Sequence, residues 1–236
     1  TLLLSAGFGT RLRPLTLKTP KCLVKINGVP LLGYWLKKLD NLGCNEVLVN
    51  THYLHEQVED YLSKSKFDNM KISTFYEESL LGTAGTLLEN LDFFQDSIGL
   101  LIHADNFTDD KLDDFISVHC SKPEDCLLTM LTFKTDNPSN CGIVEKDKDG
   151  KIINFYEKDN EYRGDCANGA LYAFNSDFLN YLKNLDIKPS DFSTEVIPKM
   201  LGKIFSYQTN SVYLDIGNHA SYEKANYIAK AQNFKI

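Results

Sequence analysis

Short apolar segments alternate with amphipathic segments through the first half of the chain. The strand-like segments are Thr1–Leu4, Glu46–Asn50, Met70–Tyr76 and Gly99–His103, and helix-like segments begin near Pro30, Leu54, Thr83 and Lys111. This alternation is typical of βαβ units, in which parallel strands pair and helices cover the sheet. The pattern therefore predicts an α/β fold with a mixed, mostly parallel sheet flanked by helices.

The chain becomes rich in strands after residue 125. The expected strands are Leu127–Phe133, Gly142–Glu145, Ile152–Tyr156 and Asn168–Phe174, with a turn at Asp147–Gly150 and a polar helix at Ala220–Ala231. No linker or repeat is visible, so we expect one domain with a β-rich insertion, divided at about 1–120, 121–218 and a C-terminal helix within 219–236. Because Leu2–Leu4 resembles the middle of a buried strand, we also expect residues or a domain upstream of Thr1.

The composition argues against several classes of protein. With 43% hydrophobic residues and only 14 Gly and 7 Pro, the chain is not disordered. No apolar run reaches the roughly 18–20 residues of a membrane span, and a net charge of −7 argues against a nucleic-acid binder. The six cysteines lack CxxC spacing, so we expect free thiols and a cytoplasmic protein rather than a zinc site.

The first loop, Ser5–Lys21, carries the strongest chemical signal. Glycines at 7 and 9 follow a strand-like segment and allow a tight turn whose N–H groups can face an anion. Three cations, Arg11, Arg13 and Lys21, lie in the same loop. The spacing is neither GxGxxG nor a Walker A loop, which ends in Gly-Lys-Ser/Thr. The loop therefore predicts a polyphosphate site of another kind.

This loop, GxGTRLRPLT followed by PK, resembles the signature of sugar-1-phosphate nucleotidyltransferases. The resemblance continues in order along nearly the whole chain, through LLGTAG (80–85), HADN (103–106), CG (141–142), YEKD (156–159), ANGALY (167–172) and YLDIGN (213–218). It is strongest to mannose-1-phosphate guanylyltransferases and related hexose- or heptose-1-phosphate enzymes. It implies a Rossmann-like (GT-A-like) fold with a β-rich sugar-binding insertion, without the C-terminal left-handed β-helix of some relatives.

The resemblance implies that a sugar 1-phosphate attacks the α-phosphorus of a nucleoside triphosphate. Arg11, Lys21 and Asp105 match the family's catalytic positions, and Asp105 and Asp215 match its Mg²⁺ ligands. The residue before Asp105 is Ala104 where the family usually has Gly, and Tyr213 replaces the usual Trp. Two carboxylates suit Mg²⁺, which takes its other ligands from phosphate and water.

The resemblance also assigns the nucleotide site. Its residues are Ala6, Gly7, Gly9, Thr10, Arg11, Lys21, Glu77, Gly82 and Thr83. Glu77 lies where relatives place a Gln or Glu against the base, and a carboxylate accepts two hydrogen bonds. Guanine offers N1–H and N2–H together, whereas uracil and thymine offer only N3–H, so this residue favours GTP. Uridylyl, thymidylyl and cytidylyl transfer stay open as alternatives.

For the sugar phosphate, the resemblance points to Gly142, Glu157, Lys158 and Asn168. The acid would contact sugar hydroxyls and the lysine the phosphate. Departures from the family pattern, at Cys141, Asp159 and Gly169-Ala170, indicate that the sugar need not be mannose. A second carboxylate motif, Asp147-Lys148-Asp149, lies in the expected polar turn and is interpreted as structural.

The expected partners are small molecules, the nucleoside triphosphate and the sugar 1-phosphate, with no nucleic acid and no membrane. A homo-oligomer stays open. Two other functions were weighed, a non-catalytic nucleotide-sugar sensor subunit and a glycosyltransferase of similar architecture. The first is disfavoured because Arg11, Lys21, Asp105 and Asp215 are all present, and the second because the triphosphate loop is intact.

Overall fold

The computed structural model describes residues 1–94, 97–159, 161 and 163–232. Its internal contacts divide the chain into two compact units. Unit 1 comprises Thr1–Leu80, His103–Leu112 and the chain from Ser211 onward, and unit 2 comprises Leu81–Ile102 and Asp113–Asn210. Each unit is thus built from separate stretches of sequence.

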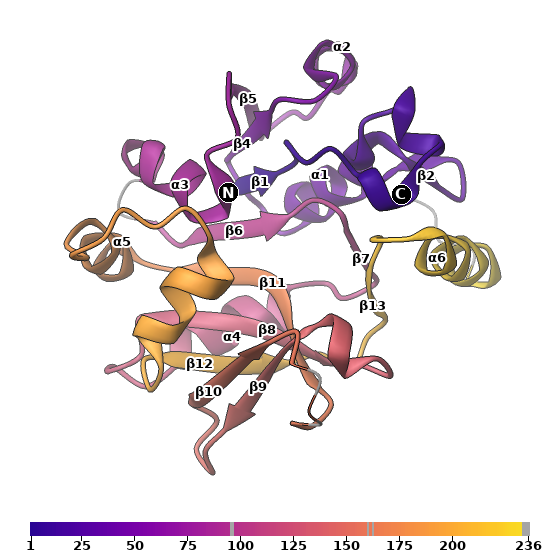
Figure 1. The fold of residues 1–236 in the computed structure, drawn as a ribbon. Coiled ribbons are helices and arrows are strands. Elements are labelled where there is room, and N and C mark those ends of the chain that lie inside the picture. Colours follow the sequence, from indigo (N-terminus) through magenta and orange to yellow (C-terminus); the bar gives the residue numbers. More distant parts are fainter. Residues whose placement is uncertain (95–96, 160, 162, 233–236) are drawn as a thin grey trace. The chain divides into compact units, whose positions relative to one another are not determined.

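Unit 1 contains a parallel sheet with the strand order β1-β4-β5 (Figure 1). The strands are β1 (Leu2–Leu4), β4 (Glu46–Thr51) and β5 (Lys71–Tyr76). Helix α1 (Leu31–Asn41) lies between β1 and β4 in sequence, and α2 (His55–Lys64) lies between β4 and β5. The carboxyl ends of parallel strands meet at one sheet edge, the usual place for a ligand site in open α/β sheets.

Helix α1 illustrates why these segments fold as predicted. Pro30 immediately precedes it, and Gly43, with φ +78°, follows its end. Its apolar face, which includes Leu32, Trp35 and Leu36, is fully or almost fully buried. The Trp35 indole N–H donates to the carbonyl of Asn106 at 2.9 Å, which attaches the helix to β7 (Asn106–Thr108).

The remaining elements of unit 1 are short. They are the hairpin β2 (Lys25–Ile26) and β3 (Val29–Pro30), the antiparallel pair β7 and β13 (Tyr213–Asp215), 3₁₀ turns at Thr10–Leu12, Leu15–Leu17 and Lys21–Leu23, and helix α6 (His219–Ala231). A buried cluster that includes Leu12, Phe107, Ile216 and Ala225 joins the first loop, β7, the segment after β13 and α6. Hydrophobic burial therefore holds together segments from both ends of the sequence.

Unit 2 is mainly antiparallel. Its strands are β6 (Gly99–His103, within this unit up to Ile102), β8 (Leu128–Lys134), β9 (Gly142–Lys146), β10 (Ile152–Glu157), β11 (Cys166–Phe174) and β12 (Ile204–Gln208). Strand β11 pairs antiparallel with β6, β8 and β9, β9 pairs antiparallel with β10, and β12 runs parallel to β8 (Figure 1). The helices are α3 (Gly82–Glu89), α4 (Asp113–Ser121), α5 (Ser176–Lys183), 3₁₀ turns at Leu91–Phe93, Pro138–Asn140 and Ile197–Met200, and a π-helical turn at Phe192–Val196.

The strands predicted from the sequence are confirmed, with ends that differ by at most two residues. Strands β2, β3, β7, β12 and β13 and helix α5 were not predicted. β7 and β13 have three residues each, too few to show a periodicity, and they pair across a large sequence separation. The expected C-terminal helix is present as far as Ala231, and residues 233–236 of that expectation lie outside the described residues. Among the described residues, no helix has the length and apolar character needed to cross a membrane.

Candidate active site

The first loop folds back on itself around Gly9. This residue has φ +61°, a conformation that favours glycine, and an added Cβ would lie 3.0 Å from Thr16 Cγ2 and 3.1 Å from Lys21 Cβ. The Thr16 hydroxyl donates to the Gly9 carbonyl at 2.7 Å. Gly7 has open space around it instead. Gly9 is therefore the glycine that the loop's path requires, and it brings Lys21 back to the end of β1.

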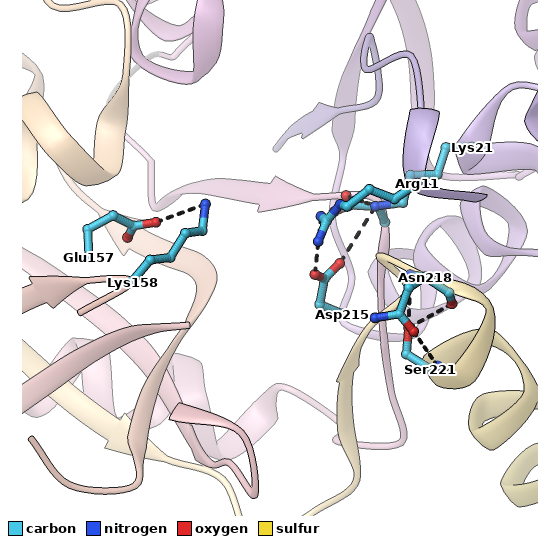
Figure 2. Close-up of polar contacts among 8 residues, drawn as sticks. Arg11, Lys21, Glu157, Lys158, Asp215, Asn218 and Ser221 are labelled. Carbon is cyan, nitrogen blue, oxygen red and sulfur yellow. Dashed lines mark hydrogen bonds and ion pairs between the residues drawn. The ribbon is translucent and has the colours of Figure 1, made fainter. Parts of the chain in front are cut away.

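Lys21 contacts both carboxylates expected to form the metal site. Its side chain is only 10% exposed, and its ammonium donates to Asp105 Oδ2 and lies 3.6 Å from Asp215 Oδ1. Figure 2 shows Arg11, Lys21 and Asp215 pointing toward one another. The structure thus brings together four residues that the sequence analysis had selected from distant segments.

Backbone hydrogen bonds explain why the two aspartates converge. Asp105 follows β6, and the preceding Ala104 N–H donates to the carbonyl of Leu4, at the end of β1, at 3.0 Å. Asp215 is opposite Asn106 in the β7–β13 pair, and the Ile216 N–H donates to the Asp105 carbonyl at 3.0 Å. Backbone hydrogen bonds therefore fix the segments that carry the two carboxylates. Ala104, before Asp105, is bonded to the end of β1, and Asp105 is bonded to Ile216, directly after β13.

Arg11 forms the outer part of the cluster. Its guanidinium lies 3.8 Å from Asp215 Oδ2, and its side chain is 68% exposed. A Cβ added at Gly217 would lie 2.6 Å from Asp215 Oδ2 and 3.0 Å from the Arg11 guanidinium. Directly after Gly217, α6 begins with a capping box in which Asn218 and Ser221 bond to each other's backbone N–H groups (Figure 2). A side chain at position 217 would therefore collide with Arg11 and Asp215 where these two residues approach each other.

The pKa values reflect this crowding of charges. Burial opposes the charge of Lys21, but Asp105 and Asp215 outweigh it and raise the pKa of the ammonium. Burial likewise opposes ionisation of Asp105, but Lys21 outweighs it and lowers the pKa of that carboxyl. The pKa of Asp215 is raised, first by burial and then by the negative charge of Asp105, even though its side chain is 52% exposed. Burial and Asp105 therefore outweigh the effect of Lys21 and Arg11 on the Asp215 carboxyl.

These residues fit a divalent cation of the Mg²⁺ type. The donors are the carboxylate oxygens of Asp105 and Asp215, both of which lie within 4 Å of the Lys21 ammonium, and Mg²⁺ prefers such oxygen ligands. Within the described residues, no group of three His, Cys, Asp or Glu side chains is placed to hold a metal. Two protein carboxylates suffice for Mg²⁺, which usually takes its remaining ligands from substrate phosphates and water.

Glu77 follows β5 and is buried, with 3% of its surface exposed. Its Oε1 accepts from Asn50 Nδ2 at 2.8 Å, and its backbone N–H donates to the Thr51 carbonyl at 2.9 Å. The Asn50 Oδ1 in turn accepts from the Ser5 N–H at 2.6 Å. The residue expected to contact the base is thus joined to the start of the first loop.

The other two residues predicted to contact the base, Gly82 and Thr83, belong to unit 2. Gly82 has φ +80°, and an added Cβ would lie 2.3 Å from the Ser190 carbonyl oxygen, so only glycine fits there. The Thr83 hydroxyl accepts from the Phe192 N–H at 2.7 Å. Within unit 2, therefore, Gly82 allows α3 to approach Ser190 closely, and Thr83 bonds α3 to the first residue of the π-helical turn.

Glu157 and Lys158 form an ion pair at the end of β10, with 3.2 Å between Lys158 Nζ and Glu157 Oε1 (Figure 2). Lys158 has φ +50°, and its N–H donates to the Cys141 carbonyl at 3.2 Å. Gly142 is opposite Glu157 in the strand pair, and an added Cβ would lie 2.7 Å from Glu157 Oε2. Three of the four predicted sugar-phosphate residues therefore form one local cluster.

Asn168, the fourth, lies at an irregularity of β11. Its Oδ1 accepts from the Ala170 N–H and its Nδ2 donates to the Tyr172 hydroxyl, both at 2.8 Å. Ala170 has φ +51°, so the Asn168 side chain stabilises a strained backbone position. Nothing in unit 2 links Asn168 directly to Glu157 through a hydrogen bond that the structure describes.

The remaining predicted residues occupy their expected segments. Ala6 is buried and Thr10 is exposed within the first loop, and the Arg13 carbonyl is 2.8 Å from His219 Nε2. Asp147 lies in a turn, as predicted, because its Oδ1 accepts from the N–H groups of Asp149 and Lys151 at 2.9 Å. The sequence analysis did not find Asn50, which lies in no motif and is marked only by its place near a strand end. Gly217 lies within the YLDIGN motif, but the sequence analysis assigned it no role of its own.

Comparison with known proteins agrees with this geometry. The sequence model of a family described as nucleotidyl transferase matches residues 1–232. The chain belongs to the nucleotidyl transferase family. The predicted resemblance to this family is therefore confirmed.

Two curated relatives of this chain carry the same name. The mannose-1-phosphate guanylyltransferase catalytic subunit beta of Drosophila melanogaster is 31% identical over 221 residues, which cover 92% of this chain and 58% of the relative. The protein of the same name from Dictyostelium discoideum is also 31% identical, covering 92% of this chain and 60% of the relative. The chain therefore spans about three fifths of the length of these relatives.

Solved structures confirm the fold. A protein from Bacillus anthracis matches with a TM-score of 0.87 at 22% identity, covering 100% of this chain and 96% of the other. HddC from Yersinia pseudotuberculosis matches with a TM-score of 0.81 at 23% identity, covering 99% and 98%. The nucleotidyl transferase chain thus has the mixed α/β fold of these proteins, as the strand–helix alternation predicted.

Proposed function

We propose that this chain transfers a nucleotidyl group from a nucleoside triphosphate to a sugar 1-phosphate, giving a nucleoside diphosphate sugar and pyrophosphate. The proposal rests on one observation above the others, the cluster of Arg11, Lys21, Asp105 and Asp215 at the ends of β1, β6 and β13. The names of the relatives, all at about 30% identity, support the same reaction. Because the chain spans only part of those relatives, the reaction is a proposal for this chain and not a transfer of their names.

The chemistry requires electrostatic help rather than a protein nucleophile. A phosphate oxygen of the sugar 1-phosphate forms a bond to the α-phosphorus, and the bond from that phosphorus to the pyrophosphate oxygen breaks. The attacking phosphate is already mostly dianionic, since its second pKa is about 6. Cys22, in the same loop, stays a neutral thiol because burial raises its pKa to about 12. Lys21 would stabilise charge at the α-phosphate, and Arg11 would hold the departing phosphates.

Asp105 and Asp215 would hold the divalent metal, which we propose to be Mg²⁺. When bound, the metal would neutralise charge on the phosphates. The two aspartates would also orient Lys21, since its ammonium already contacts both. Before substrate binds, they keep this buried lysine charged, as its raised pKa indicates. The same carboxylates thus have two tasks, metal binding and positioning of a cation.

We further propose that the nucleotide is GTP. The support is the buried carboxylate of Glu77 and the guanylyltransferase names of the relatives. One solved structure of this fold, HddC from Yersinia pseudotuberculosis, is complexed with GMP-PN. In unit 2, Glu157 would accept from sugar hydroxyls and Lys158 would bind the sugar phosphate, with Gly142 and Asn168 shaping the backbone around them.

A pyrophosphate-release assay tests the reaction directly. The purified chain is incubated with Mg²⁺, each of the four common nucleoside triphosphates and a panel of hexose and heptose 1-phosphates. We expect release only when a sugar 1-phosphate is present, and fastest with GTP. Faster turnover with UTP or dTTP would contradict the guanine assignment alone. No release with any pair, from a chain shown to be folded, would contradict the proposed reaction.

A further inference from the structure

A buried amide connects the first loop to the two neighbouring strands in unit 1. Asn50, near the end of β4, is only 3% exposed. Its Oδ1 accepts from the Ser5 N–H at 2.6 Å, and its Nδ2 donates to Glu77 Oε1 at 2.8 Å. The Ser5 hydroxyl also donates to the Asn50 carbonyl. Asn50 therefore contacts both the residue that begins the loop and the residue expected to contact the base.

The position of Asn50 explains what this amide does. The strand pairing of β1 with β4 extends to Leu4 opposite Asn50, and that of β4 with β5 extends to Thr51 opposite Tyr76. Beyond these pairs, the Glu77 N–H still donates to the Thr51 carbonyl at 2.9 Å, whereas Ser5 bonds to the side chain and the carbonyl of Asn50. A side-chain amide has one acceptor and a donor group, like a peptide unit, so Asn50 continues the cross-strand connection. It does so at the point where the chain leaves the sheet to enter the first loop.

The hydrogen bonds between Asn50 and Ser5 also affect the surroundings of Lys21 and Asp105. Ser5 and Gly7 line a small hollow together with Lys21, Cys22 and Asp105. A displacement of Ser5 would therefore change the wall of the hollow next to Lys21. An orienting hydrogen bond on Ser5 fixes the direction in which the following N–H groups of the loop can point.

We propose that Asn50 is a positioning residue for the first loop, where the triphosphate would bind, and that Glu77 orients the Asn50 amide. This inference rests on the proposed function, because it concerns the same nucleotide site. It gives Glu77 a task besides contact with the base, since one of its oxygens holds Asn50. The two tasks of Glu77 can be separated by experiment. Holding Asn50 should affect the binding of every nucleotide, whereas contact with the base should distinguish between bases.

The hydrogen bond from Asn50 to Glu77, which we call the bridge, can be tested by exchanging its donor and its acceptor. Asn50→Asp keeps an acceptor for the Ser5 N–H but removes the donor to Glu77 and places two carboxylates together. Glu77→Gln keeps an acceptor for Asn50. In the double variant N50D/E77Q, the amide of Gln donates to the new Asp, so the bridge is restored with reversed polarity and with the charge of the natural pair. The three chains have nearly identical side-chain shapes.

The measurement is the affinity for GTP and UTP, by calorimetry without sugar phosphate, together with KM and kcat for each nucleotide. We expect Asn50→Asp to weaken binding of both nucleotides about tenfold or more, because a buried hydrogen bond is replaced by repulsion. The double variant should recover to within about threefold of Glu77→Gln. Asn154→Asp is the matched control, because Asn154 Nδ2 donates to Glu145 Oε2 at the same 2.8 Å at the surface of unit 2. It should leave nucleotide affinity unchanged.

The outcomes separate this inference from the proposed reaction. A double variant as weak as Asn50→Asp, or an Asn50→Asp that binds like the natural chain, would overturn the positioning role. If Asn50→Asp does not fold, folding and binding by the double variant support the bridge. Ser5→Ala, which removes the hydroxyl bonds to the Asn50 carbonyl and to the Cys22 thiol but keeps the Ser5 N–H bond, then provides a milder test, and unchanged nucleotide affinity there would count against the positioning role. Absence of pyrophosphate release from the natural chain would contradict the reaction while the binding results still test the bridge.

Discussion

The two units differ in how each holds the side chains that the sequence predicts for substrate binding. In unit 1 the charged groups pair with one another, and Lys21 contacts Asp105 and Asp215 while it is almost buried. In unit 2 the single pair of predicted charges, Glu157 and Lys158, is more exposed, with 66% of the lysine side chain accessible. Lys21 and Asp105 are thus held in fixed positions with little solvent screening, whereas Lys158, like Arg11 at the outer part of the unit 1 cluster, is screened by solvent.

Backbone conformation shows the same contrast. In unit 2, Lys158 and Ala170 both have positive φ, and Gly142 leaves room beside Glu157. Lys158, and Ala170 two residues after Asn168, thus have unusual backbone conformations, while Gly142 and Glu157 lie opposite each other in a strand pair. In unit 1, the aspartates lie on or directly after short strands whose backbone bonds are regular. The comparison implies that changes in unit 1 should affect turnover most, and changes in unit 2 should affect affinity for the sugar phosphate.

The largest effect is expected from Asp105→Asn. It removes a proposed metal ligand and the nearest negative partner of buried Lys21, so kcat should fall by about 10²–10³-fold or more. Steady-state kinetics with a titration of Mg²⁺ would measure this. Asp40→Asn, which breaks a surface pair with Lys37 at 3.0 Å, is the control and should retain activity. Full turnover of the natural chain in excess chelator would contradict the metal assignment.

Gly217→Ala should produce the next largest effect. The new methyl would collide with Asp215 Oδ2 and the Arg11 guanidinium, which are mobile side-chain ends, so the fold should survive while both groups move. We expect kcat to fall about 10- to 100-fold with little change in Tm, since small displacements of catalytic groups are costly.

Gly33→Ala is the matched control for that prediction. Its methyl would lie 2.5 Å from the Tyr61 hydroxyl, another side-chain end, but away from the candidate site. It should therefore alter Tm more than kcat. Equal losses of kcat in both variants would mean that Gly217 has no special relation to the cluster.

Lys158→Gln should have a moderate effect and should sharpen the contrast between the units. Loss of a charge-assisted phosphate contact should raise KM for the sugar 1-phosphate roughly tenfold, with KM for the nucleotide almost unchanged. Stability should change by less than about 1 kcal/mol, since exposed ion pairs contribute little. Lys64→Gln, which removes an exposed pair with Asp60 in unit 1, should leave both KM values unchanged. A larger effect on the nucleotide KM would show that Lys158 serves the other substrate.

The smallest effect concerns pH and stability in unit 2. His119 is buried on α4, with its ring nitrogens 2.8 Å from Thr129 Oγ1 and 3.1 Å from Asn175 Oδ1, and burial lowers its pKa. The unfolded chain has the ordinary value of about 6.5, so below that pH it binds a proton more readily than the folded chain. The contribution of neutral His119 to the free energy of unfolding is thus fully present above pH 6.5. It decreases as the pH falls toward the lower pKa that His119 has in the folded chain.

Urea unfolding at a series of pH values between 7.5 and 5 would measure this, with His119→Gln as the comparison. The natural chain should lose more stability over the range than the variant, since other titrating groups are common to both. Parallel curves for the two chains would contradict the role of His119.

Much of the fold could be predicted from local sequence. The apolar face of α1 and the strand-like segments have clear periodicity, because each element buries one continuous face. The first loop was equally informative, since Gly9 and the cations around it are close together in sequence. Asn50 had no such signal, because its meaning comes from Ser5 and Glu77, which lie far away along the chain.

The sequence by itself determined which residue types are present for phosphate and metal chemistry, and in which segments they lie. Only the tertiary structure decided that Lys21 is almost buried between Asp105 and Asp215, that Arg11 lies against Gly217, and that an amide joins the loop to Glu77. The reason is physical: propensity and periodicity act over a few neighbouring residues. The charges and hydrogen bonds of the site act through space between strand ends that backbone pairing and hydrophobic burial bring together.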